Sequence, residues 1–282
     1  MIIFFSDGRL GNQIFQYAFL NTIARKNERI ITTNMKSFLN TFDCMNDKFK
    51  TYQPCKYQAS FIRIVLKRIF YFLVNIRLIG YIKQNYNNQH PLPGINRKHG
   101  LFPVTYVETH FFQSESFFDM QKLNFCLKPF YIANAKNILR TIPDTFTKVF
   151  VHVRRGDYLF EKYLGDRGID LPKKYFIRAI KEIKEKVENP YFIFLSDDPH
   201  FIECCFEEMP NKYVSRNDMP TDLALMTLCD YGICSNSSFS WWGAYLMQNR
   251  KLVLMPKYWY GWKKKVESHV GIQPNWCKII EI

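Results

Sequence analysis

"FVHVRRGDYLF", residues 150–160, indicates the fold class, because an apolar strand runs directly into a charged turn. Val149, Val151 and Val153 alternate with Phe150 and His152, so both faces of this run are apolar. That pattern predicts an interior strand of a parallel sheet. "RRGD" follows at the carboxyl end of the strand, which is where open α/β sheets bind their ligands.

Strands and helices alternate on the carboxyl side of this stretch. The predicted strands are 148–154, 191–198, 231–235 and, as the final one, 251–256. The predicted helices are 172–187, 199–208, 221–230 and 238–249. Pro172 and Pro199 stand in the first turns of two helices, and Thr221 and Asp222 are expected to cap a third. This alternation is typical of a doubly wound α/β domain.

The amino-terminal half begins in the same way. Residues 2–5 ("IIFF") predict a strand, 6–12 ("SDGRLGN") a turn, and 29–34 ("RIITTN") another strand. The helix after the turn is expected to pack through one face, formed by Ile14, Phe15, Ala18, Phe19, Thr22 and Ile23. Residues 40–100 are less periodic and end in the loop-like stretch 87–100. We therefore predict two α/β domains, 1–140 and 141–282, with a ligand in the cleft between them.

Composition agrees with a globular protein but leaves its partner open. The chain has 282 residues, 47% hydrophobic and 23% charged, enough for one large or two modest cores. Its net charge of +14 would suit nucleic acid, an anionic membrane surface or a polyanionic small ligand. No recognised nucleic-acid module is present, and the aromatic residues lie in core-like runs, so a nucleic-acid partner is the less favoured alternative.

The cysteines and the amino terminus favour a cytoplasmic protein. None of the eight cysteines forms a CxxC pair or a zinc-like group with histidines, which predicts a reduced chain without a metal site. "MIIFF" is too short for the apolar core of a signal peptide. Residues 61–83 are too often interrupted by basic residues to span a bilayer. They predict either a long helix packed on its own domain, which we favour, or an amphipathic helix on the inner face of the plasma membrane.

The charged turn after residue 153 has two interpretations. Arg154 and Arg155 could form a phosphate clamp, because guanidinium groups bind phosphate oxygens in a forked geometry. Gly156 would let the backbone approach a ligand closely, and Asp157 would orient an arginine or act as a base. The alternative is a surface Arg–Asp pair of little consequence.

A second strand end carries hydroxyl groups. In "YGICSNSSFSWWGAYL", residues 231–246, Ser235, Asn236, Ser237 and Ser238 gather at a predicted helix amino terminus, which attracts anions. A plain serine N-cap would explain the same pattern. Two phosphate-suited strand ends in one domain nevertheless favour the phosphate interpretation.

A third stretch, "DGRLGNQIFQYA" at residues 7–18, is weaker evidence when taken alone. Gly8 and Gly11 flank a strand-to-helix turn that would place Arg9, Asn12 and Gln13 at a helix start facing the predicted cleft. It lacks the glycine spacing of a dinucleotide fingerprint and the lysine of a P-loop.

Two further features have competing interpretations. Trp241 and Trp242 could border a sugar, but we favour packing of their helix against the sheet. "SDDP", residues 196–199, could be an acidic metal site, but a turn in which Asp198 and Pro199 start a helix is favoured.

Together the three stretches resemble the bacterial members of the α-1,2-fucosyltransferase family, glycosyltransferase family 11. The family is marked by a GLGNQ-type stretch, an HxRRxD motif and an SNSSFSWW-type stretch, which here read "GRLGNQIFQYA", "HVRRGDY" and "SNSSFSWWGAYL". The resemblance spans residues 7–249. Arg9 stands where many members carry glycine; related protein O-fucosyltransferases also have arginine there, and acceptor choice stays open.

The resemblance implies a GT-B-like fold, in which two Rossmann-like domains face a cleft: an acceptor-side domain, 1–140, and a GDP-sugar-binding domain, 141–282. It implies transfer of L-fucose from GDP-fucose, with inversion and without metal or cofactor, to the 2-hydroxyl of a galactoside. The expected acceptor is a galactose-terminated oligosaccharide, lipid-linked in O-antigen synthesis, which would explain a basic, membrane-facing surface. A GDP-sugar transferase with another linkage or acceptor is the alternative, and a non-catalytic lectin is less favoured.

The resemblance also implies roles by position. Arg154 would hold the β-phosphate, Ser237 and Ser238 the diphosphate, Asp222 the guanine edge and His152 the nucleoside. Asn12 would lie beside the fucosyl-phosphate oxygens. The donor-binding set is His152, Arg154, Arg155, Asp222, Ser237, Ser238, Gly11, Asn12 and Gln13, and the catalytic set is Arg154, Asp157 and Asn12. Asp157 is preferred to Asp7 as the base that accepts the acceptor's hydroxyl proton.

Overall fold

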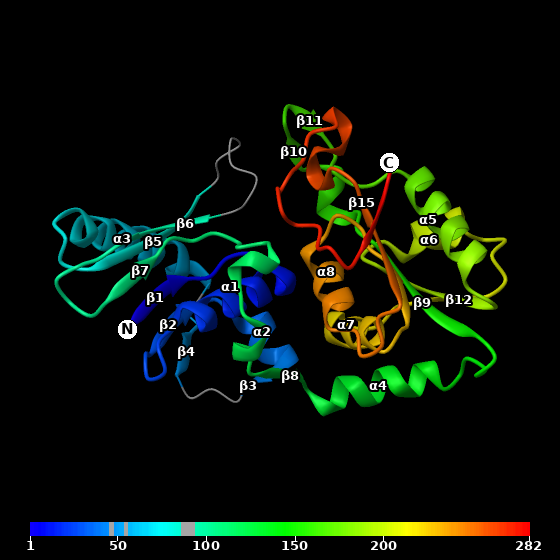
Figure 1. Cartoon of the computed structure of the whole chain (residues 1–282), viewed down its shortest axis with the longest axis horizontal. Coiled ribbons are helices and arrows are strands. Elements are labelled where there is room, and N and C mark those ends of the chain that lie inside the picture. Colours follow the sequence, from blue (N-terminus) through cyan, green and yellow to red (C-terminus); the bar gives the residue numbers. More distant parts are fainter. Residues whose placement is uncertain (45–47, 54–55, 86–93) are drawn as a thin grey trace. The chain divides into compact units, whose positions relative to one another are not determined.

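The computed structural model describes residues 1–44, 48–53, 56–85 and 94–282, with the side chains of 56–62 left out. The chain divides into two compact units, Met1–Cys126 and Leu127–Ile282, each with its own α/β layers (Figure 1). The division falls before the predicted boundary near residue 140. The physical reason is that helix α4 (Pro129–Leu139) packs against helix α7 (Met219–Thr227) of the second unit.

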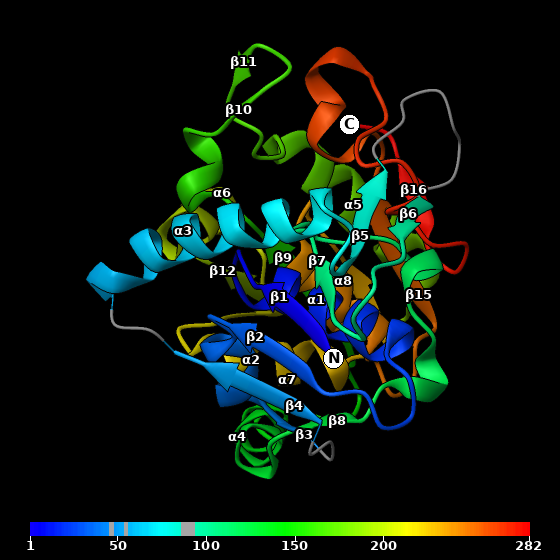
Figure 2. The same cartoon turned by 90° about the vertical axis from the view of Figure 1, so that its left-hand side faces the viewer.

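The first unit is built on a six-stranded sheet of order β4-β2-β1-β7-β5-β6. Its strands are β1 (Ile2–Phe5), β2 (Ile30–Thr33), β4 (Phe49–Tyr52), β5 (Gly80–Asn85), β6 (Gly94–Lys98) and β7 (Thr105–Val107). All neighbours are parallel except β5 and β6, which are antiparallel. Helix α1 (Leu10–Ile23) covers one face and helix α3 (Lys56–Asn75) the other, as Figure 2 shows for α3. Helix α2 (Lys36–Thr41) packs on α1, and β3 (Phe42–Cys44) pairs with β8 (Phe125–Leu127).

Helix α1 is buried on nearly all sides. Four of the six residues predicted to share one face are buried, namely Ile14, Phe15, Ala18 and Phe19, whereas Thr22 and Ile23 are partly exposed. Burial is not confined to that face, because the buried residues run from Leu10 to Asn21 with Asn12 as the exception. The sheet covers one side of α1, and aromatic side chains beyond it cover another. Tyr17, for example, stacks on Phe38 of α2 at 4.3 Å between ring centroids.

The middle of the chain differs from its prediction in two places. Residues 61–83 are not one helix: α3 ends at Asn75, and β5 begins at Gly80. The predicted loop 87–100 contains β6, which hydrogen-bonds along β5, while residues 86–93 lie outside the described residues. The favoured interpretation, a helix packed on its own domain, is confirmed for the inner face of α3. Among the described residues, no helix is long and apolar enough to cross a membrane.

The second unit has a six-stranded, fully parallel sheet of order β13-β12-β9-β14-β15-β16. Its strands are β9 (Thr147–Val153), β12 (Pro190–Ser196), β13 (Lys212–Val214), β14 (Tyr231–Ile233), β15 (Leu252–Pro256) and β16 (Lys278–Ile280). The other helices are α5 (Lys173–Lys186), α6 (Pro199–Cys205) and α8 (Ser238–Tyr245). A short ribbon, β10 (Lys162–Tyr163) with β11 (Asp166–Arg167), follows β9.

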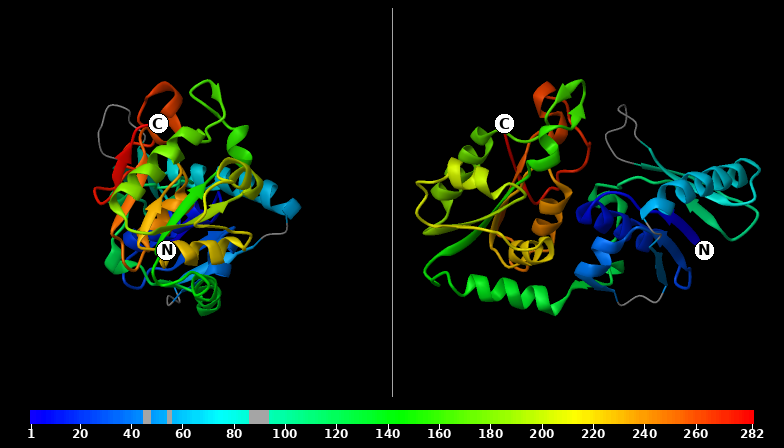
Figure 3. Two further views of the ribbon diagram at one scale, coloured as in Figure 1. Left: turned by 90° about the vertical axis from the view of Figure 1, so that its right-hand side faces the viewer. Right: turned by 180° about the vertical axis from the view of Figure 1, so that it is seen from behind.

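Strand β9 lies at the centre of this sheet. It pairs in parallel with β12 on one side and β14 on the other, and residues 149–153 are buried, so the predicted interior parallel strand is confirmed. Helices α5 and α6 cover one face and α7 and α8 the other (Figures 1 and 3). The doubly wound prediction for this half of the chain is therefore confirmed.

Two details of the second unit were predicted wrongly. The strand at 251–256 is not the final one, because β16 adds to the edge of the sheet beyond it. Helix α7 begins at Met219 and not at Thr221, since the Asp218 side chain accepts the N–H of Thr221 at 3.0 Å and caps the helix. Thr221 and Asp222 therefore stand inside the first turn.

Candidate active site

The loops after β9 and β14 meet at the carboxyl edge of the second sheet. The strands are direct neighbours, and the His152 Nδ1 atom lies 2.8 Å from Ser235 Oγ across them. Further along, the Tyr158 hydroxyl donates to the carbonyl of Asn236 at 3.4 Å. The two sequence stretches that predicted phosphate binding thus lie side by side, although 83 residues separate His152 from Ser235.

Arg154 is held by two carboxylates at this edge. Its guanidinium pairs closely with Asp157 and, at 2.8 Å, with Asp197, and its side chain is 15% exposed. The ring of Tyr158 lies 5.3 Å from the guanidinium carbon. These contacts fix the cation without saturating its five donors. Asp157 thus contacts Arg154 as expected of a residue that orients the guanidinium. Its second predicted role, as the base, stays a prediction.

Arg155 makes a different set of contacts. Its guanidinium pairs with Asp198 at 3.2 Å and with Asp170 at 3.4 Å, and it stacks over the ring of Phe201 at 3.7 Å. These partners belong to α6, to its N-cap and to the segment before α5, so Arg155 joins three pieces of the unit. Donor binding by Arg155 stays a prediction.

The "SDDP" stretch begins helix α6, as favoured from the sequence. Asp198 is the N-cap and accepts the N–H of Phe201 at 3.1 Å, while Pro199 opens the helix. Asp197 accepts the N–H of Arg155 at 2.9 Å. A Cβ atom on Gly156 would come within 2.4 Å of Asp197 Oδ2, which explains why glycine stands at that position. In the part of the chain that the structure describes, no three His, Cys, Asp or Glu residues group so that they could hold a metal ion.

The serine-rich turn leads into α8. Ser237 is the N-cap, and its Oγ accepts the N–H of Phe239 at 3.3 Å, so the N-cap interpretation is confirmed for that hydroxyl. Ser240 hydrogen-bonds the carbonyls of Ser235 and Ser237. The N–H groups of the first turn of α8 point toward this edge, but phosphate binding by Ser237 and Ser238 stays a prediction.

His152 is a neutral side chain. Burial lowers its pKa to about 3, so the imidazole carries no charge near pH 7. Its ring lies 5.4 Å from that of Phe239. It can therefore act here only as a neutral hydrogen-bond partner.

Asp222 lies in a poorly solvated position beside the loop after β13. Burial raises its pKa to about 7, although hydrogen bonds from Ser215 and Asn217 act in the opposite direction. The Ser215 hydroxyl donates to Asp222 Oδ1 at 2.5 Å. Near neutral pH this carboxyl group is thus divided between its two protonation states.

In the first unit, the turn between β1 and α1 holds the predicted site residue Asn12 and the alternative base Asp7 in defined contacts. Gly8 has φ +80°, and a Cβ atom there would come within 2.5 Å of the Asn12 side chain. Asn12 Oδ1 accepts from Gln113 Nε2 at 2.6 Å. Asp7 pairs with Arg63 at 2.8 Å; partial burial would raise the pKa of Asp7, but Arg63 and the Gly8 N–H lower it overall.

Gln13 and Gly11 have structural contacts inside the first unit. The Gln13 amide donates to the carbonyls of Gly8 and Asn34 and accepts the N–H of Phe38 at 2.9 Å, which consumes its hydrogen-bonding groups. Gly11 is buried within α1. Donor binding by these two residues stays a prediction.

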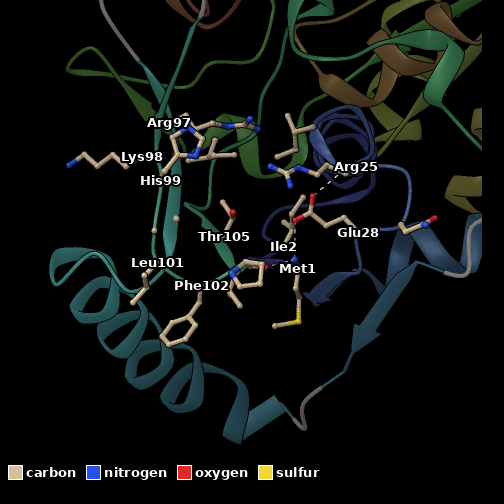
Figure 4. A pocket seen from close by; sticks show the side chains of 17 residues that line it. Met1, Ile2, Arg25, Glu28, Arg97, Lys98, His99, Leu101, Phe102 and Thr105 are labelled. Carbon is tan, nitrogen blue, oxygen red and sulfur yellow. Dashed lines mark hydrogen bonds and ion pairs between the residues drawn. The ribbon is translucent and has the colours of Figure 1, made fainter.

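A pocket of about 500 Å³ opens elsewhere on the first unit (Figure 4). It lies where β1, β5 and β7 begin, and is lined there by Ile2, Gly80 and Thr105. Because ligands of parallel sheets bind at the opposite, carboxyl edge, this pocket is not the predicted site. None of the predicted site residues lines it.

Sequence reasoning missed two groups near Arg154. Asp197 was noticed only as part of a helix start, and its partners lie 42 and 43 residues earlier, at Arg155 and Arg154. Tyr260 hydrogen-bonds the Tyr158 hydroxyl at 2.9 Å. Tyr158 adjoins the arginine motif and could have been noticed from it, whereas nothing in the sequence around Tyr260 indicates its place.

The fold is shared with solved glycosyltransferases. The fucosyltransferase NodZ from Bradyrhizobium aligns with a TM-score of 0.55 at 10% identity, over 87% of this chain and 92% of that one. A family 9 glycosyl transferase from Veillonella parvula aligns with a TM-score of 0.52 at 10% identity, over 100% of this chain and 86% of that one. These alignments show that the α/β fold of this chain is one found among glycosyltransferases.

The chain belongs to glycosyl transferase family 11, whose sequence profile matches residues 3–280. The Escherichia coli O-antigen biosynthesis glycosyltransferase WbnK is 29% identical over 92% of this chain and 95% of its own length. An α-1,2-colitosyltransferase of the same species is 32% identical over 60% of this chain and 61% of its own length. The gorilla galactoside α-(1,2)-fucosyltransferase 2 is 26% identical over 85% and 67%.

Proposed function

We propose that this glycosyltransferase moves L-fucose from GDP-fucose to the 2-hydroxyl of a galactoside, with inversion at the anomeric carbon. The observation that carries the proposal is the position of Arg154. It is fixed by Asp157 and Asp197 at the strand edge where the amino terminus of α8 also points. One pyrophosphate at this edge would meet a guanidinium and a set of backbone N–H groups together.

These groups match the charge that develops during the reaction. As the bond between fucose and phosphate breaks, the sugar becomes oxocarbenium-like and negative charge grows on the β-phosphate. Donors already oriented toward that phosphate lower the barrier, because they bind the transition state better than the ground state. Arg154 would stabilise the leaving group, and Asp157 would accept the proton of the attacking hydroxyl.

The remaining donor contacts follow the fold. In the GT-B-like arrangement that we propose, two Rossmann-like units face a cleft, with the second unit holding GDP. Asp222 and the neutral imidazole of His152 would bind the guanosine part, and Ser237 and Ser238 the diphosphate. Asn12, at the start of α1, would lie beside the transferred sugar.

The acceptor is proposed from the names of the relatives. WbnK is an O-antigen glycosyltransferase, and the gorilla relative is a galactoside α-(1,2)-fucosyltransferase, which together support a galactose-terminated oligosaccharide of a surface polysaccharide. We propose that this acceptor is lipid-linked. The colitosyltransferase favours a second candidate, transfer of colitose in the same α-1,2 linkage.

The test is a transfer assay with defined products. The purified chain is incubated with GDP-fucose, or with a colitose nucleotide donor, and a panel of galactosides that differ in the sugar beneath galactose. Product linkage is then determined by NMR. An α-1,2-fucosylated galactoside supports the proposal, a colitosylated product supports the second candidate, and the absence of any sugar transfer from either donor contradicts both.

Donor affinity is expected to depend on pH through Asp222. A carboxylate can accept both guanine N–H donors, whereas the protonated acid cannot, and the pKa of Asp222 is about 7. GDP binding should therefore weaken as pH falls below 7, by about fivefold between pH 7 and pH 6, because the deprotonated fraction of Asp222 falls from about one half to about one eleventh. Calorimetric titration of wild type and Asp222→Asn measures this. An Asp222→Asn protein with the wild-type pH dependence would assign the effect to the GDP phosphates instead.

The same group predicts a pH effect on stability, with a defined sign. Its folded pKa of about 7 exceeds the ordinary value of 3.8, so the native state binds more protons than the unfolded state between these values. The free energy of unfolding should fall as pH rises through that window. Urea titrations of wild type and Asp222→Asn would check this, because the variant should lose that part of the pH dependence.

Transfer is expected to continue in EDTA. Arg154 supplies the positive charge that a metal ion supplies in other enzymes of this chemistry, and both carboxylates of "SDDP" pair with arginines. Initial rates with and without chelator should agree within about twofold. Loss of activity that Mg²⁺ or Mn²⁺ restores would contradict the metal-independent mechanism.

A further inference from the structure

The outer face of α3 carries large apolar side chains that the first unit does not cover. Ile64, Val65, Ile69 and Phe72 are 54%, 37%, 47% and 61% exposed, and Ile76, directly after the helix, is 48% exposed. From Val65 onward they recur at spacings of four, three and four residues, and Ile64 lies two turns before Phe72, so all five share one side of the helix. The outer face of a helix in a soluble domain is ordinarily polar.

The opposite face of α3 already makes the packing contacts that the fold requires. Leu66, Phe70, Tyr71 and Leu73 pack, together with buried Val74, against the core of the first unit. That core includes Phe5, Ile79 and Tyr106. The exposed residues are therefore additional to those that hold the helix in place, and Figure 2 shows α3 lying over the sheet with its other side outward.

The apolar surface continues into the turn between β6 and β7. Leu101 and Phe102 are 77% and 54% exposed. Their N–H groups donate to the carbonyls of Arg77 and Leu78, at 3.0 and 2.8 Å, which holds the turn beside the end of α3. Figure 4 shows both side chains on the side of the pocket where α3 lies. We call the seven exposed residues the α3 patch: Ile64, Val65, Ile69, Phe72, Ile76, Leu101 and Phe102.

Basic residues surround the α3 patch. Not one Asp or Glu occurs from Lys48 to Val107, whereas this part of the sequence contains ten Lys and Arg residues. Arg68 is exposed within the row itself, and Arg77, Arg97 and Lys98 are exposed near its end. These four exposed cations thus flank the α3 patch.

We propose that the α3 patch binds the surface of an anionic phospholipid bilayer, with α3 lying in the headgroup region. Aliphatic and phenyl side chains would enter the acyl boundary while the cations pair with lipid phosphates, as in interfacial amphipathic helices. A second copy of the chain fits less well, because a two-fold contact would bring the same cations face to face. Nucleic acid fits less well too, since Ile, Leu and Val offer no stacking surface to bases.

Vesicle flotation tests the proposal on the full-length protein. Wild type should float with vesicles of equal parts phosphatidylglycerol and phosphatidylcholine, and bind pure phosphatidylcholine about tenfold or more weakly, because each cation near the bilayer surface is attracted to the anionic lipids. Ile69→Gln/Phe72→Gln should bind anionic vesicles about tenfold or more weakly, since two buried side chains are lost. A tryptophan introduced as Phe72→Trp should shift its emission to the blue when anionic vesicles are added.

The matched control is Ile177→Gln, which removes a side chain 50% exposed on α5 of the second unit and should leave binding unchanged. Both variants replace exposed residues, so their thermal midpoints and their activity on a soluble acceptor should match wild type. The proposal is overturned if wild type does not float with anionic vesicles, or if Ile69→Gln/Phe72→Gln floats as wild type does. Sedimentation equilibrium showing a dimer that this variant dissociates, without vesicle binding, would assign the patch to a second copy. The flotation, fluorescence and sedimentation readouts do not depend on the proposed sugar transfer.

Discussion

We expect Arg154→Ala to lower the rate of sugar transfer by about a hundredfold or more, equivalent to about 3 kcal/mol of transition-state stabilisation. The guanidinium lies at the carboxyl edge of β9, where its two carboxylate partners hold it in place. It is 15% exposed and contributes no apolar core, so the fold should persist. Initial rates at saturating donor, together with circular dichroism, measure both parts of the prediction.

Two further variants sharpen the test. Arg154→Lys keeps the charge but loses the forked geometry, and should recover only part of the rate. Arg178→Ala, on the exposed side of α5, removes a guanidinium that contacts the Glu281 carbonyl and should have wild-type activity. Near-normal turnover of Arg154→Ala would contradict the role that the proposed mechanism gives to Arg154.

Trp241→Ala should produce the largest loss of stability, about 3–5 kcal/mol in the free energy of unfolding. The indole is fully buried, donates to the carbonyl of Ile272 at 2.7 Å and stacks on Tyr245 with ring centroids 4.9 Å apart. Its removal leaves a cavity between α8 and the segment that carries Ile272. Urea unfolding followed by circular dichroism measures the effect.

This variant also tests the two interpretations of the tryptophan pair. Burial of Trp241 and Trp242 confirms that they pack the helix. Phe130→Ala on α4 is the control, because that aromatic ring is 66% exposed and should contribute little. A Trp241→Ala protein of normal stability but with a raised KM for the donor would instead indicate contact with a sugar.

The second unit could be predicted from the sequence because its signals are local. The central strands are short apolar runs and α5 has a clear helical period, so the alternation of strands and helices indicated the parallel sheet. Because the carboxyl ends of parallel strands lie at the same edge of a sheet, the arginine and serine stretches could also be predicted to lie at one edge. The same reasoning gave the start of α6 at Pro199.

Some errors came from contacts between residues far apart in the sequence, and others from local signals that were misread. Helix α1 is buried nearly all round because aromatic residues from later segments cover it, and an isolated helical pattern cannot show that. The periodicity of 61–83 did not mark the point where α3 gives way to β5. The cap of α7 was misplaced because Asp218 stands before a proline-containing first turn. Pairing of Asp197 with Arg154 depends on the neighbouring positions of β12 and β9.

The order in which β9 acquires its two neighbours affects how the chain folds. β12 follows β9 after a single helix, but β14 emerges only after two further helices and β13. Parallel pairings between distant segments form slowly, and until β14 arrives the apolar β9 offers an open hydrogen-bonding edge to other chains. A chain truncated before Tyr231 would therefore leave this edge of β9 unpaired, and we expect it to aggregate more readily than the full-length protein.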